Sequence, residues 1–404
     1  MAEKNILTKE SSQVDNINSV YYSIFTKGMH FKKYYTEIIS PNKLANKLPL
    51  QWWQAYYKSI TEHLVCSYND LQELSQIECL KKNFITTSIF AYSLLLRSAF
   101  FDIALIFRNR AKSDSLNLKN DCIFKNQHAF AYHIAALHEK ERYNDAKILI
   151  DKSKKNKLMR ENYYLKEENI REIFDKNTKR FNYFDNEFKD YISNKSIAVV
   201  SPAVNCPDDG AEIDSFDLVI KCNFRSSVYS NLDLKKGKRC DISYYNTITS
   251  TFLSLDKETL SEELDWAVFK KDCFLPKHRA LDTRTKYRLS TYYDYIFFNG
   301  HLNAIPNLLL DLLFNSGKKI KLFHVDFMTS TKRVKDYNPV NTNDTNKMAL
   351  IDFCHHDPFT QISLLRRLYN SGLINVDTKL RAILEKNDEQ ISSIYNSTYN
   401  NPLV

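Results

Sequence analysis

Glycine is scarce in this chain, with only six among its 404 residues and none between residues 29 and 209. The GxGxxG signature, which cradles a dinucleotide pyrophosphate, is absent. Nothing in the sequence therefore indicates NAD or adenosyl binding, and another Rossmann-type enzyme such as a methyltransferase is the least favoured interpretation.

Signals for a metal are also missing. The eight cysteines form no CxxC pair and no Cys/His metal spacing, and no DxD pair of carboxylates occurs in the loops after the strands predicted below. We therefore expect no metal ion and no other cofactor. The first residues, MAEKNILTKESSQ, lack the apolar core of a secretory signal, so we expect reduced thiols and a cytoplasmic location.

Neither blocks of like charge nor long apolar runs occur. The chain has 57 Lys and Arg against 48 Asp and Glu, and the excess of +9 is spread along it, so we expect no nucleic-acid partner. The most apolar window, residues 89–107, is interrupted by Arg97 and Asp102. This window predicts a buried helix rather than a membrane span.

The first half of the chain, residues 1–190, predicts an all-α domain. From about residue 45 the periodicity is helical, and the tripeptide FAY occurs at Phe90 and again at Phe130, an offset of 40 residues. Each copy predicts two short helices around a turn, and the second resembles a tetratricopeptide-type hairpin. An irregular helical bundle is the alternative. Either arrangement suits packing, homo-oligomerisation or docking of a partner.

The second half, residues 191–404, predicts an α/β domain with a Rossmann-like, mostly parallel sheet. Short apolar runs that predict strands lie in SIAVVSP, FDLVIKCN, CDISYYN, DYIFFNG and KIKLFHVDF, at 196–202, 216–223, 240–246, 294–300 and 319–327. The run at 305–317 predicts a helix that ends at Gly317. Ligands of such sheets bind beyond the carboxyl ends of the strands, where we expect the 201–210 loop, Asn223, Asn246 and residues 300–303.

Two segments carry a resemblance to a known family. AVVSPAVNCPDDGAEIDSFDLVIKCN (198–223) followed by GKRCDISYYN (237–246) resembles the long sialylmotif of the sialyltransferases that include the animal enzymes. HHDPFTQISLLRRLYNSGLI (355–374) is similar to the His-x4-Glu motif of that family, with His356 at the histidine and Gln361 at the glutamate. The resemblance implies a GT-A-like variant of the Rossmann-like fold.

The resemblance also implies a reaction and its residues. A sialyltransferase-like enzyme would be an inverting glycosyltransferase that moves a 2-keto sugar acid from its CMP donor to a hydroxyl of a surface glycan, without a metal. His356 would be the general base, with His355 as the competing candidate. The nucleotide would contact the amides of Asn205, Asn223, Asn246 and Asn303. Gln361 and Asp217 would support the site, although Asp217 and Asp214 are better explained as turn-fixing residues.

Departures from the family pattern leave alternatives open. Ser201–Pro202 stands at the Gly-Asn of the family, and Asn303–Ala304 stands where a Ser-Ser/Thr-Gly phosphate cradle is expected. The donor could carry Kdo or another nonulosonic acid instead of sialic acid. Alternatively, the α/β half is an inactive transferase-like domain of a helical-repeat adaptor. For the enzyme, the expected partners are the CMP-sugar and a glycan or glycolipid acceptor, the latter with peripheral association at the inner face of the membrane.

Overall fold

The structure is a computed structural model. By residue number it describes 88–89, 92, 95–96, 99–118, 127–153, 186–204, 207–229, 232–246, 264–270, 285–290, 302–315, 319–331, 334, 350, 353 and 356–399. The chain divides into two compact units, the first with residues 1–136, 350–355 and 388–404 and the second with residues 137–349 and 356–387. The two are described separately here.

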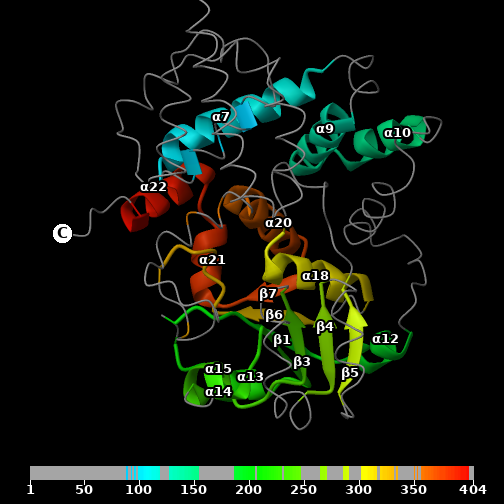
Figure 1. Cartoon of the computed structure of the whole chain (residues 1–404), viewed down its shortest axis with the longest axis vertical. Coiled ribbons are helices and arrows are strands. Elements are labelled where there is room, and N and C mark those ends of the chain that lie inside the picture. The colour runs from blue at the N-terminus through cyan, green and yellow to red at the C-terminus, as the bar shows by residue number, and fades with distance from the viewer. Residues whose placement is uncertain are drawn as a thin grey trace, which may run out of the picture. The chain divides into compact units, whose positions relative to one another are not determined.

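The second unit contains a sheet of seven parallel strands in the order β5-β4-β3-β2-β1-β6-β7 (Figure 1). The strands are β1 (Ile197–Val200), β2 (Leu218–Cys222), β3 (Ile242–Tyr245), β4 (Trp266–Phe269), β5 (Lys286–Leu289), β6 (Ile320–Phe323) and β7 (Ile374–Val376). The chain therefore builds the sheet outward from β1 to β5 and then returns to add β6 and β7 on the other side of β1. The α/β, Rossmann-like architecture expected from the sequence is confirmed.

The apolar strands are explained by burial on both faces. All four residues of β1, IAVV, are buried, and Val199 faces Ile220 of β2 and Leu322 of β6. A central parallel strand that is covered on both faces has a continuous run of apolar, often β-branched residues, and not an alternation of apolar and polar residues. This is why SIAVVSP and FDLVIKCN could be recognised as strands.

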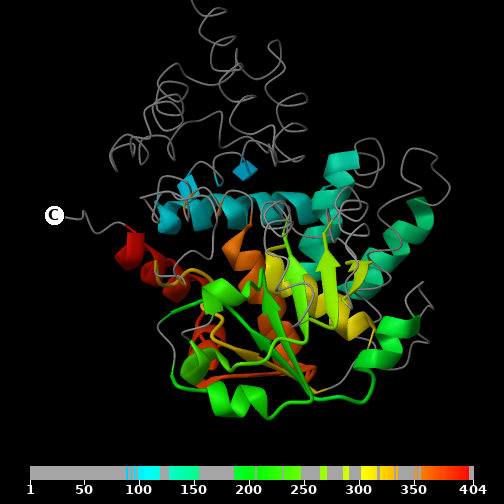
Figure 2. The ribbon, with the colours of Figure 1, turned by 60° about the horizontal axis from the view of Figure 1, so that its bottom comes forward.

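Helices lie on both sides of the sheet. Ile213 of α13 (Gly210–Asp214) packs with Ala198, Val219 and Phe323, and α14 (Ser226–Tyr229) and α15 (Asp233–Lys236) continue this layer, which Figure 2 turns toward the viewer. The other layer contains α12 (Asn186–Ile192), α18 (Ala304–Asn315) and α20 (Pro358–Asn370). In this layer α18 contacts α12, α20 and strand β3. In Figure 1, α18 and α20 lie above the strands and α13 to α15 below them.

A buried ion pair attaches α18 to the sheet. Arg288 of β5 donates to both carboxylate oxygens of Asp311, at 2.5 and 3.2 Å, and the hydroxyl of Tyr244 donates to the same carboxylate at 2.7 Å. Asp311 is fully buried and Arg288 lies 4.2 Å from the ring centroid of Phe188. Burial, followed by the charge of Asp311, raises the pKa of Tyr244 well above its usual value, so the phenol remains a donor.

The end of α9 (Gln127–Glu139) and all of α10 (Tyr143–Ser153) belong to the same unit as the sheet. Arg367 of α20 donates to the carbonyl oxygen of His138 at 2.6 Å and to the hydroxyl of Tyr143 at 2.7 Å. Thr360 of α20 also contacts the Glu139 carboxylate at 2.8 Å. The helix that follows His356 is thus anchored to the hairpin formed by the second FAY copy.

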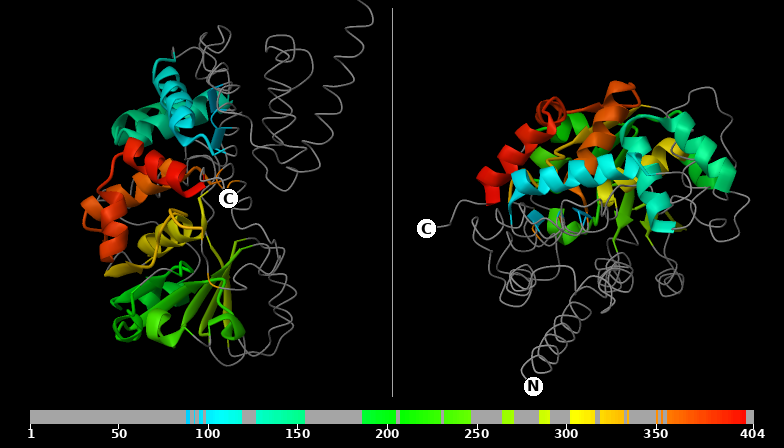
Figure 3. Two further views of the ribbon diagram at one scale, coloured as in Figure 1. Left: turned by 90° about the vertical axis from the view of Figure 1, so that its left-hand side faces the viewer. Right: turned by 90° about the horizontal axis from the view of Figure 1, so that it is seen from above.

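The first unit has an aromatic core. Phe101 of α7 (Phe101–Leu116) contacts the rings of Phe353, Tyr395 and Tyr399, the last two from α22 (Asp388–Tyr399). The backbone N–H of Phe101 donates to the Asn396 side chain at 3.2 Å. Figure 3 shows α7 and α22, which are far apart in sequence, side by side.

The local predictions are largely confirmed where they can be compared. The strands predicted at 196–202, 216–223, 240–246 and 319–327 and the helix predicted at 305–317 occur, with α18 beginning at Ala304. The second FAY copy forms two helices around residues 140–142. The strand at 294–300, Gly317 and all of residues 1–87 lie outside the described residues, and the boundary near residue 190 stays a prediction. No helix among the described residues is long and apolar enough to cross a membrane.

Candidate active site at the carboxyl edge of the sheet

The reversal of strand order places a switch point between β1 and β6. In open parallel sheets the helices on either side of such a point leave in opposite directions, which opens a crevice at the carboxyl ends of the strands. The residues that follow the strands at this edge are Ser201, Asn223, Asn246, His324 and Asp377. Two of them, Asn223 and Asn246, were candidates from the sequence.

Asn223 and Asn246 lie together after β2 and β3. The side-chain oxygen of Asn223 accepts from the backbone N–H of Asn246 at 2.9 Å, and the Asn223 backbone N–H donates to the carbonyl oxygen of Tyr244 at 2.9 Å. Asn223 is buried and has a φ of +50°, a conformation that asparagine tolerates better than most residues. Asn223 therefore positions the end of β3, and Asn246 is half-buried at the same edge.

Asn303 and Gln361 join the starts of two helices. The backbone N–H of Asn303, just before α18, donates to the Gln361 side-chain oxygen at 3.0 Å. The Gln361 amide in turn donates to the carbonyl oxygen of Asp357 at 3.2 Å, and Gln361 is buried. The Asn303 side-chain oxygen accepts from the backbone N–H of Ala304 at 2.7 Å. Both sequence candidates thus act at one place, where α18 and α20 begin.

His356 comes directly before the cap of α20 and is half-buried. The cap is Asp357, whose carboxylate accepts from the backbone N–H groups of Phe359 and Thr360 at 3.0 and 3.2 Å, and Pro358 begins the helix. This firm start holds the backbone next to His356. Two other candidates, Asn205 and His355, lie outside the described residues.

Asp217 lies at the opposite edge of the sheet. Its carboxylate accepts from both the backbone N–H and the hydroxyl of Ser196, each at 2.7 Å. The two residues precede β2 and β1, so they join these strands at their amino ends. The Ser196 hydrogen bonds also lower the pKa of Asp217, which is exposed. At this position Asp217 fixes the fold at a distance from the carboxyl edge where the other candidates gather.

The spacing between GAEID and GKRC has a steric explanation. Gly237 has a φ of +69°, and a Cβ on it would lie 2.4 Å from a carboxylate oxygen of Asp214. That carboxylate accepts from the backbone N–H groups of Lys238 and Arg239 at 2.8 and 3.1 Å. The motif therefore builds a close contact between α13 and the turn after α15.

Sequence reasoning missed a chain of polar groups between Lys236, His324 and Asp209. The ammonium of Lys236 donates to the carbonyl oxygens of Ser201 and Ala203 at 2.8 and 2.5 Å, and it lies 3.1 Å from Nδ1 of His324. Nε2 of His324 lies 2.9 Å from the Asp209 carboxylate. Because a lysine ammonium can only donate, Nδ1 is the acceptor, and Nε2 carries the proton given to Asp209.

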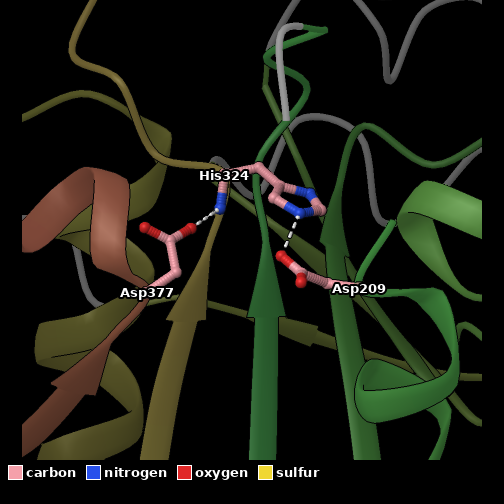
Figure 4. A group of neighbouring side chains, drawn as sticks. All are labelled: Asp209, His324 and Asp377. Atoms are coloured by element: carbon pink, nitrogen blue, oxygen red, sulfur yellow. Dashed lines mark hydrogen bonds and ion pairs between the residues drawn. The ribbon is translucent and has the colours of Figure 1, made fainter. Parts of the chain in front are cut away.

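This arrangement keeps His324 neutral. Burial lowers its pKa to about 3, and the charge of Lys236 contributes to the same shift. The imidazole points toward Asp209, whereas Asp377 accepts from the His324 backbone N–H at 2.5 Å (Figure 4). The other oxygen of Asp377 accepts from the backbone N–H of Leu380 at 2.7 Å and so caps α21 (Thr378–Leu384).

Asp209, His324 and Asp377 have the spacing of a metal site, with ligand atoms within 4.8 Å of one another. In the hydrogen-bonded arrangement described above, Nε2 of His324 carries a proton, which it would have to release before it could bind a metal. The ammonium of Lys236 next to the ring would also repel a divalent cation.

A cavity of about 200 Å³ lies beside Asp209, between α13, β6 and α21. Its wall includes Glu212, Lys321, Phe323, Lys379 and Arg381. Acidic and basic side chains are mixed around it, and Lys321 is paired with Glu212. One signal for this region was available in the sequence, because His324 is a polar residue directly after a buried strand. Nothing in the sequence marks Lys236.

No protein-family profile and no curated protein matches the chain. Among solved structures it is similar to a sialyltransferase from Campylobacter jejuni, CstII, in complex with the substrate analogue CMP-3FNeuAc, with a TM-score of 0.32 and 15% identity over 48% of this chain and 89% of that one. This similarity is distant, and the function proposed below rests on the residues of this chain.

Proposed function

We propose that the chain is an inverting glycosyltransferase that uses a CMP-activated 2-keto sugar acid of the sialic acid type, with a hydroxyl of a surface glycan as acceptor. The observation that carries the proposal is the gathering of motif residues at one edge of the sheet. Asn223 and Asn246 end adjacent strands there, while Gln361 and Asn303 link the start of the His356 helix to the start of α18.

The reaction assigned to this edge is a single displacement. The acceptor hydroxyl attacks the anomeric carbon of the donor, the new carbon–oxygen bond forms, and the bond to the phosphate breaks as CMP leaves with the electron pair. His356 takes the hydroxyl proton, for which imidazole is suited because its pKa is near neutrality. The configuration at the anomeric carbon is inverted because one displacement occurs.

The nucleotide is assigned to the asparagines. Amide groups of Asn223 and Asn246 can read the cytosine and ribose through hydrogen bonds, once a ligand competes with their mutual contact. The start of α18 would direct the positive end of its helix dipole toward the leaving phosphate. Release of the Asn303 side-chain oxygen would free the backbone N–H of Ala304 for the phosphate, and the Nδ2 group of Asn303 could donate to the same phosphate. Asn205 is a further candidate in the loop after β1.

A thermal-shift panel of CMP, CDP, UDP, NAD and S-adenosylmethionine tests the proposal. CMP at a hundredfold excess over its dissociation constant should stabilise the folded protein by about 2.7 kcal/mol. Asn246→Ala should reduce that shift, since an unmade hydrogen bond to a buried ligand costs about 1–3 kcal/mol. Stabilisation by UDP but not by CMP would overturn the assignment.

The donor sugar is the finer point. Because Ser201–Pro202 and Asn303–Ala304 differ from the family pattern, CMP-Kdo and other CMP-nonulosonic acids should be assayed beside CMP-sialic acid. Release of CMP with one donor and not the others identifies the sugar.

One observation favours a second function, that of an inactive transferase-like adaptor. In the loop after β1, the carbonyl oxygens of Ser201 and Ala203 already accept hydrogen bonds from the side chain of Lys236. If the wild-type protein binds neither CMP nor any CMP-sugar, the adaptor function replaces the enzymatic one.

A further inference from the structure

We propose that Lys236 and His324 are positioning residues that fix the loop after β1, and hence nucleotide affinity, through a chain of hydrogen bonds ending at Asp209. This inference rests on the proposed function for its nucleotide, but the chain itself is defined by the geometry alone. Asp209 lies within the 198–223 segment that carries the resemblance, although it was not a site candidate, whereas Lys236 and His324 lie outside the motif segments.

The loop depends on Lys236 for its shape. Ser201 and Ala203 are buried, and both of their carbonyl oxygens point to the one ammonium group. The carbonyl oxygen between them, of Pro202, accepts from the backbone N–H of Val334 at 3.0 Å. Three successive carbonyl oxygens are therefore held by side-chain or distant backbone donors. Substitution of Lys236 removes two of these three contacts.

The charge of Lys236 also needs compensation. Its side chain is almost fully buried, at 1% exposure, and a buried ammonium is costly unless it is paired. The nearest negative charge in the chain of contacts is Asp209, which Lys236 reaches through the neutral imidazole of His324. The imidazole accepts from Lys236 at Nδ1 and donates to Asp209 at Nε2. It therefore links the ammonium to the carboxylate in one fixed orientation. Lys236 and Asp209 should therefore be energetically coupled even though no contact joins them.

The same fold offers a matched control in Lys221. This residue of β2 is also fully buried, and its ammonium donates to the carbonyl oxygen of Gly237 at 2.8 Å, near the rings of Phe224 and Tyr229. Gly237 directly follows Lys236 in the sequence, and none of these contacts of Lys221 reaches the loop after β1. Both lysines contribute to stability, whereas only Lys236 should affect the loop.

Binding of CMP to Lys236→Met and Lys221→Met, measured by calorimetry, separates the two roles. Both variants should melt at lower temperature than the wild type. Lys236→Met should bind CMP about tenfold more weakly, a loss of about 1.4 kcal/mol, whereas Lys221→Met should stay within about twofold. Equal CMP affinity of both variants would overturn the positioning role. If the wild type binds no CMP, the proposed function fails instead, and the two failures are distinguishable.

A double-mutant cycle tests the chain without any ligand. Lys236→Met, Asp209→Asn and the double variant are compared by urea unfolding. The double variant should unfold at a higher urea concentration than the sum of the two single shifts predicts, because removing one charge already removes the need for the other. Additive shifts would overturn the coupling.

Two substitutions of His324 keep the proposal falsifiable if Lys236→Met does not fold. Gln at this position offers both an acceptor for Lys236 and a donor for Asp209, whereas Leu offers neither. Gln and Leu should lose about the same conformational free energy in the backbone here, because residue 324 has a φ of +62° in the left-handed region. His324→Gln should retain CMP affinity within about threefold and His324→Leu should lose about tenfold. Equal affinities of these two variants would contradict the role of the ring.

Discussion

At the scale of single residues, the conformation and the protonation state are set by immediate neighbours. Gly237 and Gly372 both have positive φ values, +69° and +67°, but only Gly237 is crowded. His324 is neutral because it is buried beside an ammonium. Such effects depend on a few atoms, so each can be tested by one substitution.

Gly237→Ala should destabilise the protein by about 2 kcal/mol or more. The left-handed conformation costs a non-glycine residue about 1–2 kcal/mol, and the added Cβ would also collide with Asp214 at 2.4 Å. Gly372→Ala is the control, because nothing lies within 4 Å of its Cβ, and it should cost only the conformational part. Urea unfolding measures both. Equal costs would show that Asp214 moves aside freely.

Loss of His324 should change how stability depends on pH. The histidine pKa is about 3 in the folded protein, against 6.5 for the unfolded chain. As pH falls below 6.5 the unfolded chain binds a proton that the folded protein does not, so stability falls between about pH 6.5 and pH 3. The slope from this one group approaches about 1.4 kcal/mol per pH unit.

His324→Gln should therefore have a flatter stability curve between about pH 4.5 and 6.5, a range above the usual pKa of most carboxylates. Urea unfolding at a series of pH values measures it. An unchanged slope would mean that His324 titrates normally.

At the scale of elements, specific side chains fix how helices meet the sheet and one another. The buried pair of Arg288 and Asp311 holds α18 against β5, while Gln361 ties the start of α18 to the start of α20. These contacts decide where the helix starts lie, and the helix starts carry the proposed chemistry.

Asp311→Ala should destabilise the protein by about 3–5 kcal/mol, the usual effect of leaving one partner of a buried ion pair alone. The guanidinium of Arg288 is 5% exposed, so water cannot replace the carboxylate. Glu187→Gln is the control, because it breaks the solvent-exposed pair between Glu187 and Lys286 and should cost less than about 1 kcal/mol. Chemical denaturation measures the loss of unfolding free energy in both variants. Similar losses would contradict the exclusion of water from the Arg288–Asp311 pair.

His356→Ala should lower turnover by about 10²–10⁴-fold, the usual contribution of general acid–base catalysis. CMP affinity should be nearly unchanged, because the residue is expected to act on the acceptor hydroxyl only in the transition state. Steady-state transfer assays and CMP binding measure the two effects. His355→Ala is the control and should cost much less. If His355→Ala abolishes transfer while His356→Ala does not, the two roles are exchanged.

At the scale of the whole molecule, the sheet topology decides where function can reside. The switch point lies between β1 and β6, and residues from five strand ends meet at its edge. Neither the spacing of cysteines nor the hydrogen-bonded state of Asp209, His324 and Asp377 favours a metal there.

Transfer activity should therefore survive EDTA. The monophosphate leaving group carries less charge than a pyrophosphate, and under the proposed function the dipole of α18 would stabilise it. Initial rates with and without excess EDTA, and with added Mg²⁺ or Mn²⁺, measure this. An absolute requirement for either ion would show that carboxylates at the edge bind a metal.

The sequence by itself determined the local elements of the sheet's centre and the ends that follow them. β1, β2, β3, β6 and α18 were predicted because their apolar runs are bounded by polar residues, and Asn223 and Asn246 were placed at strand ends for the same reason. Asp-Pro followed by an amphipathic pattern is typical of a helix start, and α20 begins at this point after His356. These features depend on interactions within a few residues.

Other elements could not be found in this way. β5 is an edge strand with the partly exposed sequence KYRL, β7 has only three residues, and the four apolar residues of β4 do not distinguish a strand from a helix. These segments become strands because a neighbouring strand supplies their hydrogen bonds.

Only the tertiary structure decided the partners of Lys236. His324 lies 88 residues from Lys236 and 115 from Asp209, yet the three form one chain of contacts. The order of the strands brings them together, and that order is set by long-range packing on β1. Burial of Lys236 and His324 then fixes the direction of their hydrogen bonds, because the ammonium can only donate and the imidazole must accept from it and donate to Asp209.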